Sequence, residues 1–309
     1  MTKEFCQVDW DAALIDDCRQ LIQLAVREDL DCEQDWTTVS LVAHDAQAQV
    51  SIVARQSGIL AGLPIVELIV EQLELDVRWS PAMTDGDRLK PSSLIGMLQG
   101  NVRDLLTSER IILNFLGRLC GIATLTGQYV KAVSSTNVRI YDTRKTTPGW
   151  RRLEKYAVRQ GGGTNHRVGL YAAAMAKDNH LAWFKQAGNS QAELKNLAPA
   201  IRSFLESHLG QEAASQKLVE IEVDTLDQLQ EVLPSGPDII LLDNMSLDEL
   251  RSAISLRDKL AAEVELEASG GVNLDTVQQI AETGVDRISV GALTHSASSL
   301  DIGLDWSAE

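Results

Sequence analysis

The sequence has little positive charge. Its 28 Lys and Arg residues are outnumbered by 44 Asp and Glu residues, which gives a formal net charge of −16 and a pI near 4.7. Proteins that bind nucleic acid carry a basic face that neutralises many phosphates. The one basic segment of the chain, residues 141–180, lacks interleaved aromatic side chains. We therefore expect no nucleic-acid partner.

Paired cysteines, a secretion signal and a long apolar run are also missing. No C-x-x-C pair occurs among the four cysteines Cys6, Cys18, Cys32 and Cys120. This predicts neither a zinc site nor a disulfide framework and favours a reducing compartment. Residues 1–17 are polar and acidic, unlike a signal peptide, and no apolar run approaches the roughly 20 residues that span a bilayer. We expect a soluble, cytoplasmic protein without a membrane partner.

Length and composition are those of an ordinary globular protein. The 309 residues are 44% hydrophobic and 23% charged, which is typical of soluble domains. This length can hold one barrel and a smaller module.

The first third of the chain reads as α+β. Helical spacing of apolar residues predicts a helix over 9–30, short strands are expected at 49–55 and 58–62, and a second helix opens at Pro64. A long apolar helix should run from an N-cap at Ser108 to about Val133. Arg110 would then lie in its first turn, where the helix dipole disfavours a cation and favours a bound anion.

From Asn137 onward, strands and helices alternate. Strands are expected at 138–141, 218–223, 238–242, 266–268 and 287–290, and helices at 148–160, 170–176, 225–233, 246–262 and 274–283. This alternation predicts parallel strands joined by right-handed crossovers. The strands end on polar or glycine-rich residues, as in a barrel active site. Because five or six strands are found rather than eight, we expect an incomplete (β/α) barrel. Residues 184–217, a polar loop and one helix, show no recognisable chemistry.

The basic segment holds eight cations and three anions within an acidic protein. The cations are Arg144, Lys145, Arg151, Arg152, Lys155, Arg159, Arg167 and Lys177, and the anions are Asp142, Glu154 and Asp178. Such a concentration of charge predicts a site for a small polyanion. Arg151, Lys155 and Arg159 are spaced four apart, and we interpret them as a solvated stripe on a helix.

Six motifs resemble a known family. They are, in order, DTRKTTPG, LEKYAVR-GGG-NHR-GLY, KDNH, LLDN, EASGG and SVGALTHS, and they resemble those of the quinolinate phosphoribosyltransferases, also called carboxylating nicotinate-nucleotide pyrophosphorylases. NFLGRLCGIATLT and REDL extend the resemblance into the first third. It implies that quinolinate and phosphoribosyl pyrophosphate give nicotinate mononucleotide, pyrophosphate and CO2 in de novo NAD synthesis.

The resemblance also implies an architecture. We expect an N-terminal α/β (α+β) sandwich over residues 1–117, joined by residues 300–309, and an incomplete α/β barrel over residues 118–299. Magnesium dependence is implied, with Mg2+ carried mostly by the pyrophosphate substrate and no dedicated metal ligands assigned. A homodimer or higher homo-oligomer is implied as well.

Site residues follow from matching the motifs. Carboxylates are best held by arginine forks, and the family's dicarboxylate pocket matches Thr143, Arg144, Lys145, His166, Arg167 and Lys177. The arginine that the neighbouring subunit lends matches Arg110. The ribose-contacting acids match Glu222 and Asp243, which can steady the positive charge that develops on the ribose. Catalysis is assigned to Lys145, Lys177, Glu222 and Asp243. Whether Lys177 donates a proton or only binds stays open.

Glycine-rich turns predict the phosphate seat. The last loops of a barrel commonly bind phosphate, and the residues that match are Ser269, Gly270, Gly271, Val290, Gly291 and Ala292. The run Gly161–Gly163 ends a helix and is interpreted as a cap. Glu220 and Asp224 are interpreted as ordinary polar positions.

Other functions remain open at this point. A barrel lyase could use Lys177 as a Schiff-base nucleophile on a sugar phosphate, although such an enzyme has no dicarboxylate to neutralise. A non-catalytic sensor of phosphoribosyl ligands is a third class. A related phosphoribosyltransferase that acts on another substrate is also possible, because a fold does not determine a substrate.

Overall fold

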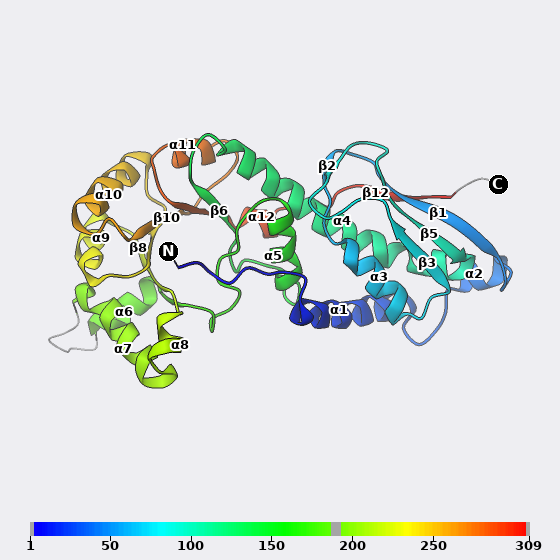
Figure 1. Ribbon diagram of the computed structural model, residues 1–309, viewed down its shortest axis with the longest axis horizontal. Coiled ribbons are helices and arrows are strands. Elements are labelled where there is room, and N and C mark those ends of the chain that lie inside the picture. Colours follow the sequence, from blue (N-terminus) through cyan, green and yellow to red (C-terminus); the bar gives the residue numbers. More distant parts are fainter. Residues whose placement is uncertain (1–2, 187–192, 307–309) are drawn as a thin grey trace. The chain divides into compact units, whose positions relative to one another are not determined.

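The computed structural model describes residues 3–186 and 193–306, and the chain divides into two compact units (Figure 1). The parallel-sheet unit comprises Met1–Gln7, Gln128–Arg144 and Thr164–Ala292. The antiparallel-sheet unit comprises Val8–Gly127, Lys145–Gly163 and Leu293–Glu309. These units are defined by packing contacts, and each consists of three separate stretches of chain. The expected domain boundary after residue 117 therefore stays a prediction.

The antiparallel-sheet unit contains a four-stranded sheet of order β12-β1-β5-β3 and a two-stranded sheet of β2 and β4. β12 pairs with β1, with Ile52 opposite Leu304, so residues 302–306 form an edge strand of this sheet. The strands are β1 (Gln47–Ala54), β2 (Gly58–Ile59), β3 (Val77–Pro81), β4 (Arg88–Leu89), β5 (Leu94–Asn101) and β12 (Ile302–Trp306).

Helices make up much of the rest of this unit. In α1, the Asp11 side chain caps the first turn by accepting a hydrogen bond from the Leu14 N–H at 2.9 Å. Its buried residues Leu14, Cys18 and Ile22 recur every four positions, which places them on one face. The helices are α1 (Ala12–Leu30), α2 (Trp36–Leu41), α3 (Leu63–Gln72), α4 (Val102–Ala132), α5 (Arg151–Gln160) and α12 (Ala292–His295).

The long helix α4 begins earlier than predicted. Asn101, not Ser108, supplies the capping side chain, because its Oδ1 accepts the Arg103 N–H at 2.9 Å. Ser108 is buried, and its hydroxyl donates to the Asp104 carbonyl at 2.7 Å. Arg110 therefore lies beyond the first turn, where the helix dipole has little influence. The prediction that Arg110 lies in the first turn of this helix was wrong.

By length and composition alone, α4 could also cross a membrane. An 18-residue window of it has a mean hydropathy of 1.2, and 67% of that window is buried. No membrane-spanning helix was expected from the sequence. Such burial is equally typical of a core helix in a soluble protein.

The parallel-sheet unit contains six parallel strands in the order β6-β11-β10-β9-β8-β7. Within the described residues, β6 and β7 are the two edges, so the incomplete barrel of the sequence analysis is confirmed. Thr164 adds a parallel bridge to Tyr141 at the β6 edge. The strands are β6 (Arg139–Tyr141), β7 (Ala174–Ala176), β8 (Val219–Val223), β9 (Ile239–Asp243), β10 (Glu265–Ser269) and β11 (Arg287–Ser289).

Helices connect these strands, and in Figure 1 α9, α10 and α11 lie along the outer side of the sheet. A capping box of Ser246 and Glu249 starts α10 where the sequence predicted a helix. The helices are α6 (Asp178–Gln186), α7 (Leu197–Leu209), α8 (Gln211–Ser215), α9 (Leu226–Val232), α10 (Leu247–Leu260) and α11 (Val277–Ala281), with 3-10 turns η1 (Leu194–Asn196) and η2 (Leu233–Ser235).

Two predicted helical regions differ. Residues 170–176 were expected to form a helix, but the chain turns there and enters β7, where Met175 pairs with Glu220. Pairing with β8 overrides the helical propensity of this alanine-rich stretch. In 184–217 the prediction was one helix, whereas α7 and α8 follow the end of α6. Part of that predicted loop, 187–192, lies outside the described residues.

One face of the parallel sheet is charged. Successive side chains of a strand point to opposite faces, so the polar residues of β8, β10, β11 and β6 share one face while the apolar residues between them share the other. Glu220, Glu267 and Arg287 on this face have exposed fractions of 0%. The charged face is formed by Glu220, Glu222, Glu265, Glu267, Ser269, Arg287, Ser289, Arg139 and Tyr141.

Candidate active site

The carboxyl ends of the six strands bring most of the predicted site residues to one edge of the sheet. Because the strands are parallel, their carboxyl ends meet at that edge. The register places Asp243 beside Ser269 and Ser289 beside Tyr141. The residues at or just beyond these ends are Thr143, Arg144, Lys177, Glu222, Asp243, Ser269, Gly270, Gly271, Val290 and Gly291.

Arg110 and Lys145 belong to the antiparallel-sheet unit. The Arg110 side chain is 70% exposed, and its guanidinium lies 3.4 Å from the carboxylate of Glu109. Lys145 is exposed, and its carbonyl accepts the Thr294 hydroxyl at 2.7 Å.

The predicted solvated stripe on α5 is wrong. Lys155 has an exposed fraction of 0%, and Arg151 and Arg159 are only partly exposed. Arg159 forms an ion pair with Asp9. Sequence spacing alone could not show that other elements of the antiparallel-sheet unit cover this helix.

Arg167 is a buried cation, with an exposed fraction of 5%. Its Nη1 donates to the Ala173 carbonyl at 3.4 Å. Burial lowers the pKa of Arg167; the charge of Glu220 opposes this change and the positive charge of Arg144 adds to it. The positive charges of Arg144 and Arg167 therefore act against each other, and a bound anion would relieve that repulsion.

Lys177 and Glu222 form an ion pair at the more accessible part of this edge. The side chains are 42% and 11% exposed, respectively. Burial raises the pKa of Glu222, and Lys177 opposes that rise. The Lys177 N–H donates to His180 Nδ1 at 3.0 Å, which fixes the start of α6. A ligand can therefore reach both an ammonium group and a carboxylate here.

The loop after β9 is locked to the loop after β10. Asn244 donates from Nδ2 to Asp243 Oδ2 at 2.7 Å and from its backbone N–H to the Ser269 carbonyl at 2.9 Å. Gly270 has a φ of 94°, and a Cβ there would lie 2.1 Å from Asn244 Oδ1. Both the backbone conformation and the lack of space require glycine. This packing fixes the orientation of Asp243.

The His166 side chain lies below the carboxyl edge of the sheet and contacts two buried carboxylates. Its ring is buried and lies 4.3 Å from the Phe5 ring. Nε2 lies 3.1 Å from Glu220 Oε2 and 3.6 Å from Glu267 Oε1. The interpretation of Glu220 as an ordinary polar position was therefore wrong, and Glu267 was not singled out. The two-residue period of VEIEV, which places Glu220 on the same face as Glu222, was the available signal.

The two buried carboxylates differ in protonation. Burial, opposed by His166 and reinforced by Glu220, raises the pKa of Glu267 to about 7. Burial also acts to raise the pKa of Glu220, but the hydrogen bond from His166 and the charges of Arg167 and Arg287 together outweigh it and hold that pKa below its usual value. Two neighbouring carboxylates in a dry site favour one shared proton. We infer that Glu220 is ionised and that Glu267 holds the proton.

The donor atoms of His166, Glu220 and Glu267 lie within 4.8 Å of one another, and these residue types can bind metal. His166 Nδ1, however, accepts the Arg167 N–H at 2.8 Å. A metal on Nε2 would then leave no proton on the imidazole, and Arg167 and Arg287 already compensate the acids. The cluster suits a proton better than a metal ion.

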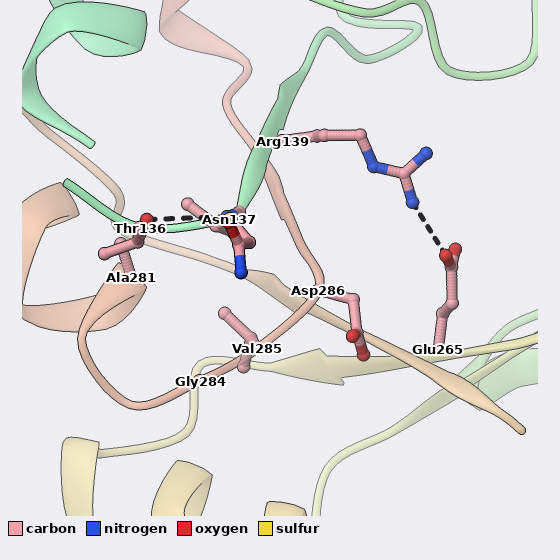
Figure 2. A pocket seen from close by; sticks show the side chains of 9 residues that line it. Thr136, Asn137, Arg139, Glu265, Ala281, Gly284, Val285 and Asp286 are labelled. Carbon is pink, nitrogen blue, oxygen red and sulfur yellow. Dashed lines mark hydrogen bonds and ion pairs between the residues drawn. The ribbon is translucent and has the colours of Figure 1, made fainter. Parts of the chain in front are cut away.

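A cavity of about 300 Å³ lies at the amino ends of β6, β10 and β11 (Figure 2). Arg139 forms an ion pair there with Glu265 at 2.7 Å, and Asp286 accepts from Arg257 at 2.9 Å. No predicted site residue lines this cavity. Its charged groups are already paired, so the cavity is a poorer candidate than the carboxyl edge.

Comparisons with known proteins agree with the geometry. Residues 35–120 match the family model "Quinolinate phosphoribosyl transferase, N-terminal domain", and residues 122–305 match the corresponding C-terminal domain. A nicotinate-nucleotide pyrophosphorylase [carboxylating] of Mycobacterium leprae is 41% identical over 94% of this chain and 97% of its own. A nicotinate-nucleotide pyrophosphorylase structure from Francisella tularensis superposes with a TM-score of 0.84 at 33% identity, covering 98% of this chain and all of its own. A Streptococcus pyogenes NadC structure has a TM-score of 0.83 at 40% identity, covering 97% and 99%.

The buried acid pair predicts a pH-dependent stability. The pKa of Glu267 is about 7 in the folded protein and 4.5 ordinarily. Because the folded protein binds this proton more tightly than the unfolded chain, protonation of Glu267 adds to the free energy of unfolding. The contribution, at most about 3 kcal/mol, is complete below pH 4.5 and is lost as the pH rises through 7. Glu267→Gln removes the titration, so the wild type should lose more stability than this variant between pH 5 and 8. Urea unfolding at the two pH values measures the difference.

The control for this prediction is Glu231→Gln on the exposed face of α9. It should follow the wild-type pH trend. Parallel trends for wild type and Glu267→Gln would contradict the assignment of a proton to Glu267.

Proposed function

Because the chain belongs to the quinolinate phosphoribosyltransferase family, we propose that it transfers the phosphoribosyl group of phosphoribosyl pyrophosphate to quinolinate. The products are nicotinate mononucleotide, pyrophosphate and CO2, as in de novo NAD synthesis. The observation that carries this proposal is the pair of cations at the carboxyl edge of the parallel sheet, the buried guanidinium of Arg167 and the partly exposed ammonium group of Lys177. A flat dicarboxylate is a ligand that would neutralise both.

Quinolinate binding is assigned to the cations of this edge. Guanidinium groups hold carboxylates through two parallel hydrogen bonds, and the burial of Arg167 strengthens such a contact because little water competes. Lys177 provides a further positive charge that is accessible to solvent. Thr143, Lys145 and His166 complete the proposed set, with His166 acting from below rather than as a ligand of the pyridine.

The ribose and pyrophosphate are assigned to the acids and glycines. Glu222 and Asp243 would hold the ribose hydroxyls and stabilise positive charge on the ring as pyrophosphate departs. Magnesium would arrive as part of the phosphoribosyl pyrophosphate substrate, since this ion usually keeps waters and phosphate oxygens as ligands. The 5-phosphate would bind the backbone of Ser269–Gly271 and of Val290–Ala292.

The loss of CO2 needs little further machinery. Once the pyridine nitrogen carries the ribose, its positive charge stabilises the carbanion that decarboxylation leaves at the adjacent carbon, and this carbanion then takes up a proton to give the product. The protein's contribution is then orientation and charge placement. A Schiff-base lyase is disfavoured, because Lys177 is engaged in an ion pair with Glu222, whereas a Schiff-base lysine must be neutral to attack.

The assembly and location are proposed as well. A homodimer or higher homo-oligomer would let Arg110, largely exposed on α4, reach the site of a neighbouring subunit. The four cysteines are all free, which is consistent with the reducing environment of the cytoplasm.

Removal of either guanidinium should weaken quinolinate binding. In Arg144→Ala or Arg167→Ala, the lost charge-assisted hydrogen bonds should raise the quinolinate Kd about tenfold or more. Calorimetry measures the Kd, and release of CO2 and pyrophosphate measures turnover in the wild type. Arg251→Ala, on the exposed surface of α10, is the control. An unchanged Kd in Arg144→Ala or Arg167→Ala would refute the pocket.

A shared site predicts complementation between subunits. Arg110→Ala and Lys177→Ala should each abolish most activity as pure oligomers. Mixed oligomers of the two variants should recover part of it, because one site per mixed dimer then has both residues. Activity after mixing by unfolding and refolding tests this, and no recovery in verified mixed oligomers would exclude a site completed by Arg110.

Neighbouring glycines should differ in their tolerance of alanine. Gly270 and Gly271 both have positive φ, 94° and 62°, so backbone strain of about 1–2 kcal/mol applies to each. Only at Gly270 would a Cβ meet Asn244; at Gly271 it meets nothing within 4 Å. Gly270→Ala should therefore raise the KM for phosphoribosyl pyrophosphate more than Gly271→Ala does. Equal effects in steady-state kinetics would show that the contact with Asn244 is unimportant.

A further inference from the structure

Three consecutive backbone N–H groups hold Arg167 in place. The segment Asn165–Arg167 belongs to no helix or strand. Its N–H groups donate in turn to Gln7 Oε1, Asp142 Oδ1 and His166 Nδ1, each at 2.8 Å. Because no regular ladder fixes this segment, the side chains of Gln7, Asp142 and His166 fix the backbone that carries the Arg167 guanidinium.

The third of these bonds depends on the tautomer of His166. A neutral imidazole has one N–H and one bare nitrogen. Since Nδ1 accepts the Arg167 N–H, the ring proton must be on Nε2, which lies 3.1 Å and 3.3 Å from the two oxygens of Glu220. The bond that one ring nitrogen makes determines the state of the other.

The surroundings of the ring favour this arrangement. Glu220 has an exposed fraction of 0% and accepts the Nε2 proton as a carboxylate. The other titratable or charged groups that act on these acids are Glu267, Arg167 and Arg287, with Ser289 beside Glu267. The Phe5 ring covers one face of the imidazole, so water does not compete from that side.

We propose that Glu220 is a positioning residue for quinolinate binding: by holding the His166 proton on Nε2, it keeps Nδ1 free to anchor the backbone of Arg167. The inference rests on the proposed function for its substrate. It assigns Glu220 no contact with quinolinate or with phosphoribosyl pyrophosphate, in contrast to Glu222 two residues further along β8.

A matched pair of isosteric variants tests the proposal. In Glu220→Gln, the side-chain amide can donate a hydrogen bond to Nε2, which moves the ring proton to Nδ1. The Nδ1–H and the Arg167 N–H are then two donors that face each other, so the bond that anchors Arg167 is lost. The quinolinate KM should rise about tenfold or more, while the KM for phosphoribosyl pyrophosphate changes less than about threefold. Glu267→Gln mimics the protonated form of Glu267, and its quinolinate KM should change less than about threefold.

The tautomer itself is a readout that a purely structural role would not move. Nitrogen chemical shifts of 15N-histidine-labelled protein distinguish the two tautomers, and the signal lost in His166→Gln identifies His166 among the five histidines. The wild type should show the Nε2–H tautomer, and Glu220→Gln the Nδ1–H tautomer. This measurement needs no substrate, so it tests the inference separately from the proposed reaction.

Several outcomes would overturn the proposal. A wild-type His166 in the Nδ1–H or doubly protonated form at neutral pH would do so even if Glu220→Gln failed to fold. An unchanged quinolinate KM in folded Glu220→Gln, or an equal loss in Glu267→Gln, would do so as well. Stoichiometric metal in the purified protein that is lost in Glu220→Gln would assign the cluster to metal binding instead. A wild type that does not turn over quinolinate, but has the Nε2–H tautomer, would refute the reaction alone.

Discussion

The burial of charge on one face of the parallel sheet is the constraint on which the structure of this unit depends. Glu220, Glu267 and Arg287 are fully buried there. An isolated ion in such a place costs several kcal/mol, so each charge must meet a complement from another strand. Arg287 lies against Glu265 and Glu4 and stands 4.7 Å from the Tyr141 ring centre. Where complementation is incomplete, Glu267 takes up a proton instead.

The same constraint connects the interior with the edge. Below the carboxyl edge of the sheet, the polar groups are buried away from solvent, and their hydrogen bonds hold the backbone that carries Arg167 in one arrangement. At the edge, Lys177 and Glu222 are partly open to solvent and can exchange their mutual contact for contacts with a ligand. A buried cation held by a rigid network, beside an accessible ion pair, is an arrangement that favours a small anion over water.

The N-terminal segment is part of this network although it lies far away in sequence. Phe5 packs on His166, Gln7 bonds the backbone of Asn165, and Glu4 accepts from the Tyr141 hydroxyl at 2.6 Å. The composition of residues 1–17 indicated only a polar, acidic stretch that belonged to the first domain. Contacts across more than a hundred residues of sequence leave no periodic signal, so nothing in the local pattern could indicate this role.

Local patterns did determine much of this protein. The alternation of strands and helices after Asn137 predicted the parallel sheet, Ser246 marked the start of α10, and the ordered motifs identified the family and the residues at the carboxyl edge. The sequence pattern could not show which polar side chains are buried away from solvent. The sequence predicted a solvated position for Lys155, an ordinary polar position for Glu220, a cap at Ser108 and a helix over residues 170–176. These predictions failed because helical and strand propensities are local, whereas burial and strand pairing depend on segments that meet only in the folded chain. Tertiary structure alone determined the hydrogen-bond partners of the His166 Nε2. A buried hydrogen bond forms between groups that packing brings within about 3 Å of each other, and these groups need not be neighbours along the sequence.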